Sequence, residues 1–144
     1  MPGKPIAIAS DHAGFELKQA VIKHLGAEKV LDLGAGSLES VDYPDFGKAV
    51  GDAITSGKAD QGIVICGSGI GISIAANRNK AVRAALCMNT EMAMLARQHN
   101  NANVLALGAR LVDVATALDI VNMFFKTEFE GGRHARRVDK LGNC

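Results

Sequence analysis

The sequence predicts an α/β protein with a Rossmann-like, three-layer α/β/α fold around a mostly parallel sheet of about five strands. Two observations predict it. Short apolar runs alternate along the chain with amphipathic stretches of helical spacing. These runs show little polar alternation, which is typical of strands covered on both faces, as in a parallel sheet. Because 144 residues suit one domain and no linker or repeat interrupts them, we expect residues 1–144 to form a single domain.

Five apolar runs are the predicted strands: Ile6–Ala9, Val30–Leu33, Gly62–Cys66, Val82–Leu86 and Val104–Leu107. A helical pattern follows each run, so we expect parallel strands joined by right-handed crossovers.

Five helices are predicted from apolar spacing and from residues that start or stop helices. The first carries Leu17, Val21 and Leu25 on one face and stops at Gly26. The second runs from Asp45 or Phe46 to about Ile54, and the third from Ile70 to Ala76. The fourth runs from Glu91 to about Gln98 and is capped by Asn89-Thr90. The fifth runs from Val114 to about Phe125 and is capped by Asp113.

Composition narrows the function classes. The net charge is +1, which gives no general attraction to nucleic acid or to an anionic membrane. Tyr43 is the only tyrosine and tryptophan is absent, so an aromatic platform for single-stranded nucleic acid is disfavoured. The apolar run Ile6–Ala9 is too short for a signal peptide or a membrane span. Three cysteines without a CxxC pair indicate a reducing, cytoplasmic compartment and no metal site.

Polar residues follow two of the predicted strands at their carboxyl ends, where ligands bind in such sheets. Asp11 and His12 follow the first strand, although Asp is also a common helix cap. Cys66-Gly-Ser-Gly-Ile-Gly71 ends the third strand, and its glycines let backbone N–H groups approach an anion at a helix start. A tight turn without a ligand is the alternative. The GxGxG spacing differs from the dinucleotide fingerprint GxGxxG, so NAD is disfavoured.

Cys66 is the cysteine whose position favours reactivity. It stands beside a glycine-rich helix start, and a helix N-terminus lowers the pKa of a thiol. The alternative is a small buried core residue. Cys87 also ends a strand but no glycine loop follows it, so we interpret it as structural, and Cys144 is the exposed last residue.

His99 lies at the end of the fourth predicted helix, before the fifth strand, and therefore at the amino edge of the sheet. One alternative is a simple interaction with the helix dipole. If His99 is catalytic, it acts in the site of a partner subunit across a two-fold interface. The basic tail contains Arg133, His134, Arg136 and Arg137, and Arg110 follows the fifth strand. Arginine suits phosphate because its planar fork binds two oxygens, although charge runs are usually solvated.

Five stretches together resemble one family closely, the type B ribose-5-phosphate isomerases, which are grouped with the galactose-6-phosphate and allose-6-phosphate isomerases. The stretches are SDHAGFELK (10–18), DYPDF (42–46), GIVICGSGIGISIAANR (62–78), ARQHNNANVLALGAR (96–110) and EGGRHARRV (130–138). The resemblance implies a homodimer, or a dimer of such dimers, with sites shared across the interface. It implies metal-free interconversion of ribose 5-phosphate and ribulose 5-phosphate in the pentose phosphate pathway, with no cofactor, no nucleic acid and no membrane partner.

The same resemblance implies roles for individual residues. Cys66 is the base that takes the proton from C2. The branch without this cysteine uses a Glu after the last loop glycine, where this chain has Ile72. The amides of the loop hold the enediolate oxygens. Ser68, which stands where many members have Thr, is a catalytic residue that helps to shuttle protons at those oxygens. The loop residues implied in substrate binding are Gly67, Gly69, Ile70 and Gly71.

Further roles fall outside the loop. Asp11 and His99 open the furanose ring, and Asn100 contacts the reacting oxygens. Tyr43 matches a tyrosine near the site. The implied phosphate or ring contacts are His12, Arg110, Arg133 and Arg137. The C-terminal segment from about residue 130 packs at the site or at the subunit interface.

Three alternative functions stay open. A six-carbon sugar phosphate is the nearest, because pocket length decides it. A cysteine-dependent phosphatase fits less well, because residues 67–71 contain no Arg. A nucleotide-phosphate-binding regulatory module would use the glycine loop without catalysis.

Overall fold

Five parallel strands form one sheet in the order β2-β1-β3-β5-β4 in the computed structural model, which describes residues 3–144. The strands are β1 (Ile6–Ser10), β2 (Val30–Asp32), β3 (Gly62–Cys66), β4 (Ala84–Leu86) and β5 (Val104–Gly108). Every neighbouring pair runs parallel, so the carboxyl ends of β1, β3 and β5 lie side by side at one edge.

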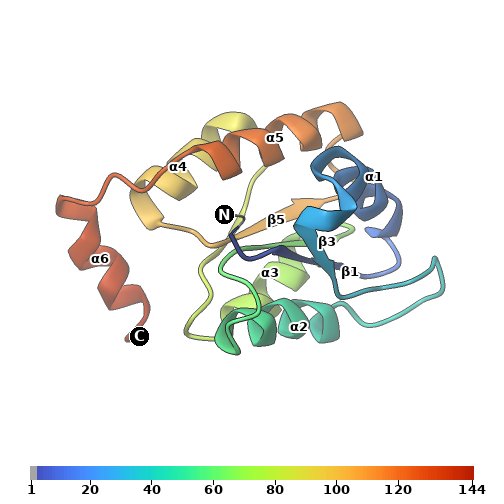
Figure 1. Cartoon of the computed structure of the whole chain (residues 1–144), viewed down its shortest axis with the longest axis horizontal. Helices are drawn as coiled ribbons and strands as arrows, with labels where there is room; N and C mark the ends of the chain where they lie inside the picture. Colours follow the sequence, from blue (N-terminus) through green and yellow to red (C-terminus); the bar gives the residue numbers. More distant parts are fainter. Residues whose placement is uncertain (1–2) are drawn as a thin grey trace.

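Helices cover both faces of this sheet, which confirms the predicted three-layer fold. They are α1 (Phe15–Leu25), α2 (Tyr43–Thr55), α3 (Ile70–Asn77), α4 (Thr90–Asn100), α5 (Val114–Lys126) and α6 (Arg133–Leu141), with a 3₁₀ turn, η1 (Ala27–Lys29). Figure 1 shows α1, α4 and α5 on one face and α2 and α3 on the other.

Local sequence signals explain where the helices begin and end. The Asn89 and Asp113 side chains accept hydrogen bonds from the backbone N–H groups of Met92 (2.8 Å) and Thr116 (2.7 Å), which caps α4 and α5 as predicted. Gly26, at φ +102°, ends α1. The start of α2 lies before the predicted Asp45, because Pro44 fits the first turn of a helix, where its missing N–H costs nothing.

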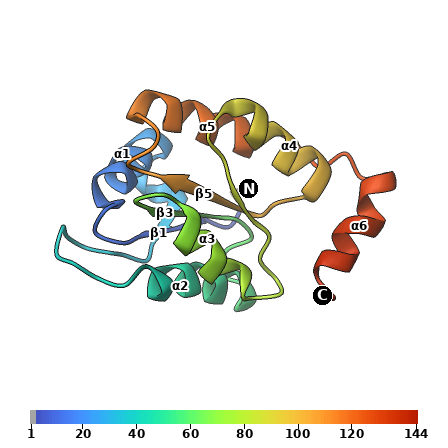
Figure 2. The ribbon, with the colours of Figure 1, turned by 180° about the vertical axis from the view of Figure 1, so that it is seen from behind.

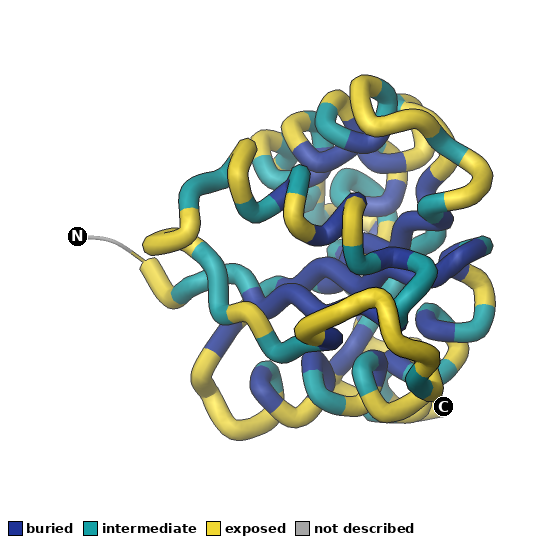
Figure 3. The backbone as a smooth tube through the Cα atoms, turned by 90° about the vertical axis from the view of Figure 1, so that its right-hand side faces the viewer, coloured by how far each residue is buried: buried dark blue, intermediate teal, exposed yellow. Residues whose placement is uncertain are grey.

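The core has two halves, one on each side of the sheet, because successive side chains of a strand point to opposite faces. In β3, Ile63 and Ile65 pack toward α1 and α5, whereas Val64 and Cys66 pack toward α2 and α3. Figure 3 shows the central strands as buried backbone inside an outer layer of exposed helix turns. Cys66 is therefore directed to the side on which α3 begins.

The edge strands are shorter than predicted. β2 and β4 have three residues each, and most of them are half-buried, whereas all five residues of β3 and of β5 are buried. Val82, which was expected to start the fourth strand, is buried in the loop before it.

An ion pair between a buried lysine and a partly exposed aspartate supports the carboxyl edge near β1. Lys18 is 1% exposed, and its Nζ donates a 2.7 Å hydrogen bond to Oδ1 of Asp32 at the end of β2. The same oxygen accepts from the backbone N–H of Gly34 at 3.0 Å. The backbone of Gly34 and Ala35 in turn pairs with Ser10, the last residue of β1. The pair thus fixes the segment beside the start of the Asp11 loop.

The C-terminal segment forms α6, which sequence reasoning left without a predicted structure. Figures 1 and 2, seen from opposite sides, agree that α6 stands at the amino end of the sheet next to α4. Among the described residues, no helix is both long enough and apolar enough to cross a membrane.

Candidate active site

A pocket of about 600 Å³ opens at the carboxyl edge of the sheet. It is lined by Asp11, Tyr43, Cys66, Gly67, Ser68, Ile70, Gly71, Ile74, Arg110 and Leu111. The predicted site residues of the first strand, the glycine loop and the fifth strand therefore meet in one place, as parallel strands require.

Cys66 lies at the floor of this pocket, 5% exposed. Its Sγ accepts a hydrogen bond from the backbone N–H of Gly69 at 3.2 Å. In the β3–β5 register Cys66 faces Gly108, and its carbonyl accepts from Ala109 at 2.9 Å. The thiol is thus held between a helix N-terminus and the end of β5, while one side faces the pocket.

Gly69 makes the turn from β3 into α3 in the left-handed region, at φ +76°. A Cβ at this position would lie 2.8 Å from the carbonyl carbon of Leu107 and 3.0 Å from the amide nitrogen of Gly108. Both neighbours are backbone, so neither can move aside easily. The position requires glycine for conformation and for space.

The Ser68 hydroxyl oxygen accepts a hydrogen bond from the backbone N–H of Ile70 at 3.1 Å. This leaves its proton free to be donated toward the pocket. The guanidinium of Arg110 lies over Gly67, where a Cβ would come within 2.9 Å of Nη1. Arg110 places a positive charge at the mouth of a pocket whose floor carries the thiol.

Asp11 and Tyr43 also line the pocket. Oδ1 of Asp11 accepts from the backbone N–H of Gly14 at 3.1 Å, so the carboxylate closes the turn before α1 and also lines the pocket. The ring of Tyr43 packs over Gly71. His12, unlike Asp11, is not among the residues that line the pocket. Its Nδ1 accepts a hydrogen bond from the backbone N–H of Val41 at 3.2 Å. A neutral His12 ring therefore carries its proton on Nε2.

Sequence reasoning missed two residues of the pocket wall. Ile74 is 50% exposed and Leu111 is 53% exposed. Ile74 stands one helical turn after Ile70, so the pair forms an apolar stripe on α3 that faces outward. Apolar spacing could have flagged Ile74, but it could not have told an exposed stripe from a core one.

A second pocket, of about 620 Å³, lies between α2 and α3 and shares Tyr43, Gly71 and Ile74 with the first. Its charged side chains include Lys48 and Asp52, which bind one another at 2.6 Å. It contains neither the thiol nor the amides of the glycine loop, so we take the carboxyl-edge pocket as the candidate site.

The remaining predicted site residues lie at the amino edge. His99 and Asn100 end α4, just before β5, and Arg133 and Arg137 lie on α6. Along β3, Gly62 pairs with the first residue of β5 and Cys66 with the last. Four residues of strand span about 13 Å, so this edge and the thiol are separated by the length of the sheet. Within one chain the structure does not bring these residues to Cys66.

His99 has close neighbours of its own at that edge. Its ring stacks on that of His134, with centroids 4.3 Å apart and planes at 13°. Glu130 lies within 3.9 Å of His99 and within 3.5 Å of His134. Burial lowers the pKa of His134, and the nearby charges of His99 and Arg133 lower it further, while Glu130 acts in the opposite direction. Sequence reasoning placed His134 in the basic tail and assigned it no partner.

Cys87 differs from Cys66 in its surroundings. Burial raises the pKa of the Cys87 thiol to about 12, and the side chain is 1% exposed. It stays protonated at neutral pH, which fits a structural role.

Comparison with known proteins decides the family. The chain matches the family model for Ribose/Galactose Isomerase over residues 6–141. It belongs to this family. Ribose-5-phosphate isomerase B of Escherichia coli (strain K12) is 45% identical over 141 residues, which cover 96% of this chain and 94% of the relative.

Solved structures of Ribose/Galactose Isomerase relatives agree with the fold. Ribose-5-phosphate isomerase B of Clostridium thermocellum is 53% identical with a TM-score of 0.94, covering 96% of this chain and 95% of that chain. The enzyme of Mycoplasma genitalium, solved with bound ribulose-5-phosphate, is 45% identical with a TM-score of 0.93, covering 99% and 97%. The chain is thus an isomerase of the Ribose/Galactose Isomerase family over nearly its whole length.

Proposed function

We propose that this chain interconverts D-ribose 5-phosphate and D-ribulose 5-phosphate. The observation that carries the proposal is the thiol of Cys66 at the floor of a pocket, bordered by the glycine-rich start of α3. Family membership supports it, as does the 45% identical relative that was solved with bound ribulose-5-phosphate.

The proposed reaction moves one proton between neighbouring carbons without a metal. The Cys66 thiolate takes the proton from C2 of the open-chain aldose, and the electron pair of the C–H bond forms the enediolate. A second proton moves from the C2 hydroxyl to O1, shuttled by the Ser68 hydroxyl. The Cys66 thiol then returns the carbon-bound proton to C1, which gives the ketose. Amide groups of the loop and the free Ser68 hydroxyl proton stabilise the oxygens on which negative charge develops. A base of this kind typically contributes about 10²–10⁴-fold.

Ring opening and phosphate binding need residues from the other edge, so we propose that two copies share each site. His99 and Asn100 of one subunit would meet Cys66 and Asp11 of its partner, and Arg133 and Arg137 would bind the phosphate. The position of α6, which projects beyond the amino edge next to α4, supports this arrangement. The segment from about residue 130 then packs at the interface. We place the enzyme in the cytoplasm, where sugar phosphates are metabolised.

The first experiment measures turnover of ribose 5-phosphate by the purified protein in EDTA, with Cys66→Ala in parallel. We expect the wild type to be active and the variant to lose nearly all turnover. Unchanged activity in Cys66→Ala would remove Cys66 from the chemistry. An inactive wild type would contradict the proposed substrate, and the same assay with allose 6-phosphate and galactose 6-phosphate would test the six-carbon alternative.

A second experiment tests the shared site. Cys66→Ala and His99→Asn subunits are each expected to be inactive. If they are mixed, dissociated and reassembled, half of the dimers are mixed, and each mixed dimer has one site with both residues intact. Recovery to about a quarter of wild-type turnover is expected. A mixture that stays inactive, although subunit exchange is demonstrated, would contradict the shared site.

A further inference from the structure

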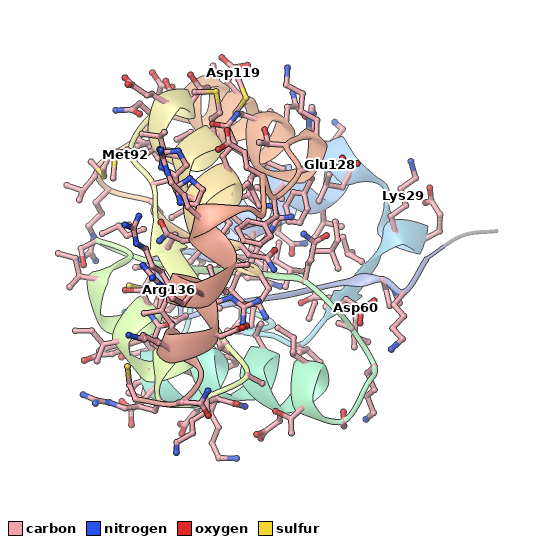
Figure 4. The ribbon with its side chains drawn as sticks, turned by 90° about the vertical axis from the view of Figure 1, so that its left-hand side faces the viewer. Lys29, Asp60, Met92, Asp119, Glu128 and Arg136 are labelled. Carbon is pink, nitrogen blue, oxygen red and sulfur yellow. The ribbon has the colours of Figure 1, made fainter. Side chains whose placement is uncertain are left out.

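Three potential metal ligands converge at the amino edge, outside the carboxyl-edge pocket. His99 comes from the last turn of α4 and His134 from the first turn of α6. Glu130 comes from the connector, residues 127–132 between α5 and α6. Their ligand atoms all lie within 4.8 Å of one another. Figure 4, in which Arg136 marks α6, shows this helix standing in front of the strands at that edge.

The distances suit a transition metal. With bonds of about 2.0–2.2 Å in tetrahedral geometry, neighbouring ligand atoms lie about 3.4 Å apart. Glu130 Oε1 is 3.5 Å from Nε2 of His134 and 3.9 Å from Nε2 of His99. Two imidazoles and one carboxylate form a ligand set that zinc-type cations accept, with a fourth position left for water or another ligand.

Two hydrogen bonds hold Glu130 and the segment before it against the end of α4 without a metal. The N–H of Glu130 donates to the carbonyl of Gln98 at 3.1 Å, next to His99. Nε of Arg97 donates to the carbonyl of Thr127 at 3.0 Å, which fastens the connector to α4. These bonds keep Glu130 beside the end of α4, so part of the ordering cost of a three-ligand site is met on folding.

Ring orientation is the part that must change on binding. The two imidazoles are stacked nearly parallel, so their lone pairs run side by side, whereas a shared ion requires them to converge. The His134 side chain is 9% exposed and is held in place, whereas the His99 side chain is 39% exposed and has room to turn. A bound metal would therefore break the stack by rotating His99.

We propose that His99, Glu130 and His134 bind a zinc-type divalent cation, and that the bound ion inhibits the isomerase. The inhibition rests on the proposed function, because His99 is there assigned to ring opening, and a His nitrogen bound to a metal cannot transfer a proton. The ion also links α6 to α4 and so restrains the helix that carries Arg133 and Arg137. It plays no part in the proton transfer itself.

Binding is tested without any activity assay. The EDTA-treated, desalted protein is titrated with Co²⁺, whose visible absorption is intense in four-coordinate nitrogen and oxygen sites. We expect one equivalent per chain, and at least about tenfold weaker binding in Glu130→Gln and in His134→Gln. His24→Gln is the matched control, because His24 bonds Asn122 on α5 and lies outside the cluster. Equal binding in all four proteins would overturn the site, and so would loss of binding in Cys144→Ser alone.

Inhibition is tested with Zn²⁺ in a buffer without chelator. Ribose 5-phosphate turnover of the wild type should fall as Zn²⁺ rises and recover on addition of EDTA. Glu130→Gln, compared with its own metal-free turnover, should need at least about tenfold more Zn²⁺ for the same fractional loss. Equal sensitivity of wild type and variant would overturn inhibition through this site. A wild type without turnover would contradict the proposed function, while the Co²⁺ titration would still decide whether the metal site exists.

Discussion

The backbone N–H of Gly69 donates a hydrogen bond to Sγ of Cys66 at 3.2 Å. This bond holds the sulfur atom at the start of α3, on the side that lines the pocket. The bond is made by the backbone, so folding of the glycine loop creates it without any further side chain.

The first prediction concerns the nature of the base. Cys66→Ser keeps an acceptor for the Gly69 N–H, but a hydroxyl does not ionise near neutral pH. We expect turnover to fall by about 10²–10⁴-fold, with little change in the melting temperature. Steady-state kinetics together with thermal denaturation measure both. A serine variant that retains more than half of the wild-type turnover would show that Cys66 is not the base.

The second prediction separates two glycines of the loop. Gly69→Ala forces a Cβ against the backbone of Leu107 and Gly108 at a positive φ, so we expect a loss of about 1–3 kcal/mol in the free energy of unfolding. Gly67→Ala meets the far end of the flexible Arg110 side chain, which can move, so stability should hardly change while KM rises. Urea denaturation and kinetics on both variants test this. A similar loss of stability in the two variants would contradict it.

The third prediction concerns the Lys18–Asp32 pair, whose members differ in exposure, 1% and 43% for their side chains. Asp32→Ala leaves the Lys18 ammonium buried without its partner, which we expect to cost about 3–5 kcal/mol. Lys18→Met leaves Asp32 in contact with water and should cost at most about 1.5 kcal/mol. Denaturant unfolding of both variants measures the two losses in the free energy of unfolding. Equal losses in Asp32→Ala and Lys18→Met would show that the Lys18 ammonium finds another partner.

The fourth prediction concerns pH. The pKa of His134 is lowered, first by burial and then by His99, Arg133 and Arg137, against the raising effect of Glu130. Because the folded pKa lies below the ordinary value of 6.5, the unfolded chain binds the proton more readily. The contribution of His134 to stability is complete above pH 6.5 and is lost as pH falls from there through the folded pKa. His134→Gln should therefore lose less stability than the wild type between pH 7.5 and pH 5, as measured by denaturant unfolding. Parallel pH profiles would contradict this prediction.

The fifth prediction uses thiol alkylation. The thiol of Cys87 has its pKa raised to about 12 and is 1% exposed, so iodoacetamide should leave it unmodified in the native protein. Cys144 is exposed and should react first. In a Cys144→Ser background, peptide mass spectrometry should find label on Cys66, reduced when ribose 5-phosphate is present. Label on native Cys87 would mean that the α4 side of the core opens readily.

Much of this fold could be predicted from the sequence because its signals are local. Apolar runs mark the strands, and Asn89 and Asp113 mark helix starts through contacts only three residues away. The carboxyl edge of the site could also be predicted, since Asp11, Cys66 and Arg110 follow strands that pair in parallel.

The remainder depends on contacts between residues far apart in the chain. The His99 ring stacks on the His134 ring because α6 packs beside α4. Residue spacing in the sequence does not predict that packing. The burial of the Lys18 ammonium was not predicted either. A lysine beside Leu17 on an amphipathic helix is expected to reach solvent, and only the fold places Asp32 next to it.

The division of the core by the sheet has a consequence for engineering. Cys66 shares its half with Val50, Val64 and Ile72, so a substitution there reshapes the floor of the pocket as it changes packing. The other half, around Ile120 and Phe124, contains no residue of the site. Substitutions that raise the melting temperature should therefore leave turnover unchanged when they lie in the core under α5. Stabilising substitutions in the core under α2 and α3 should also change turnover.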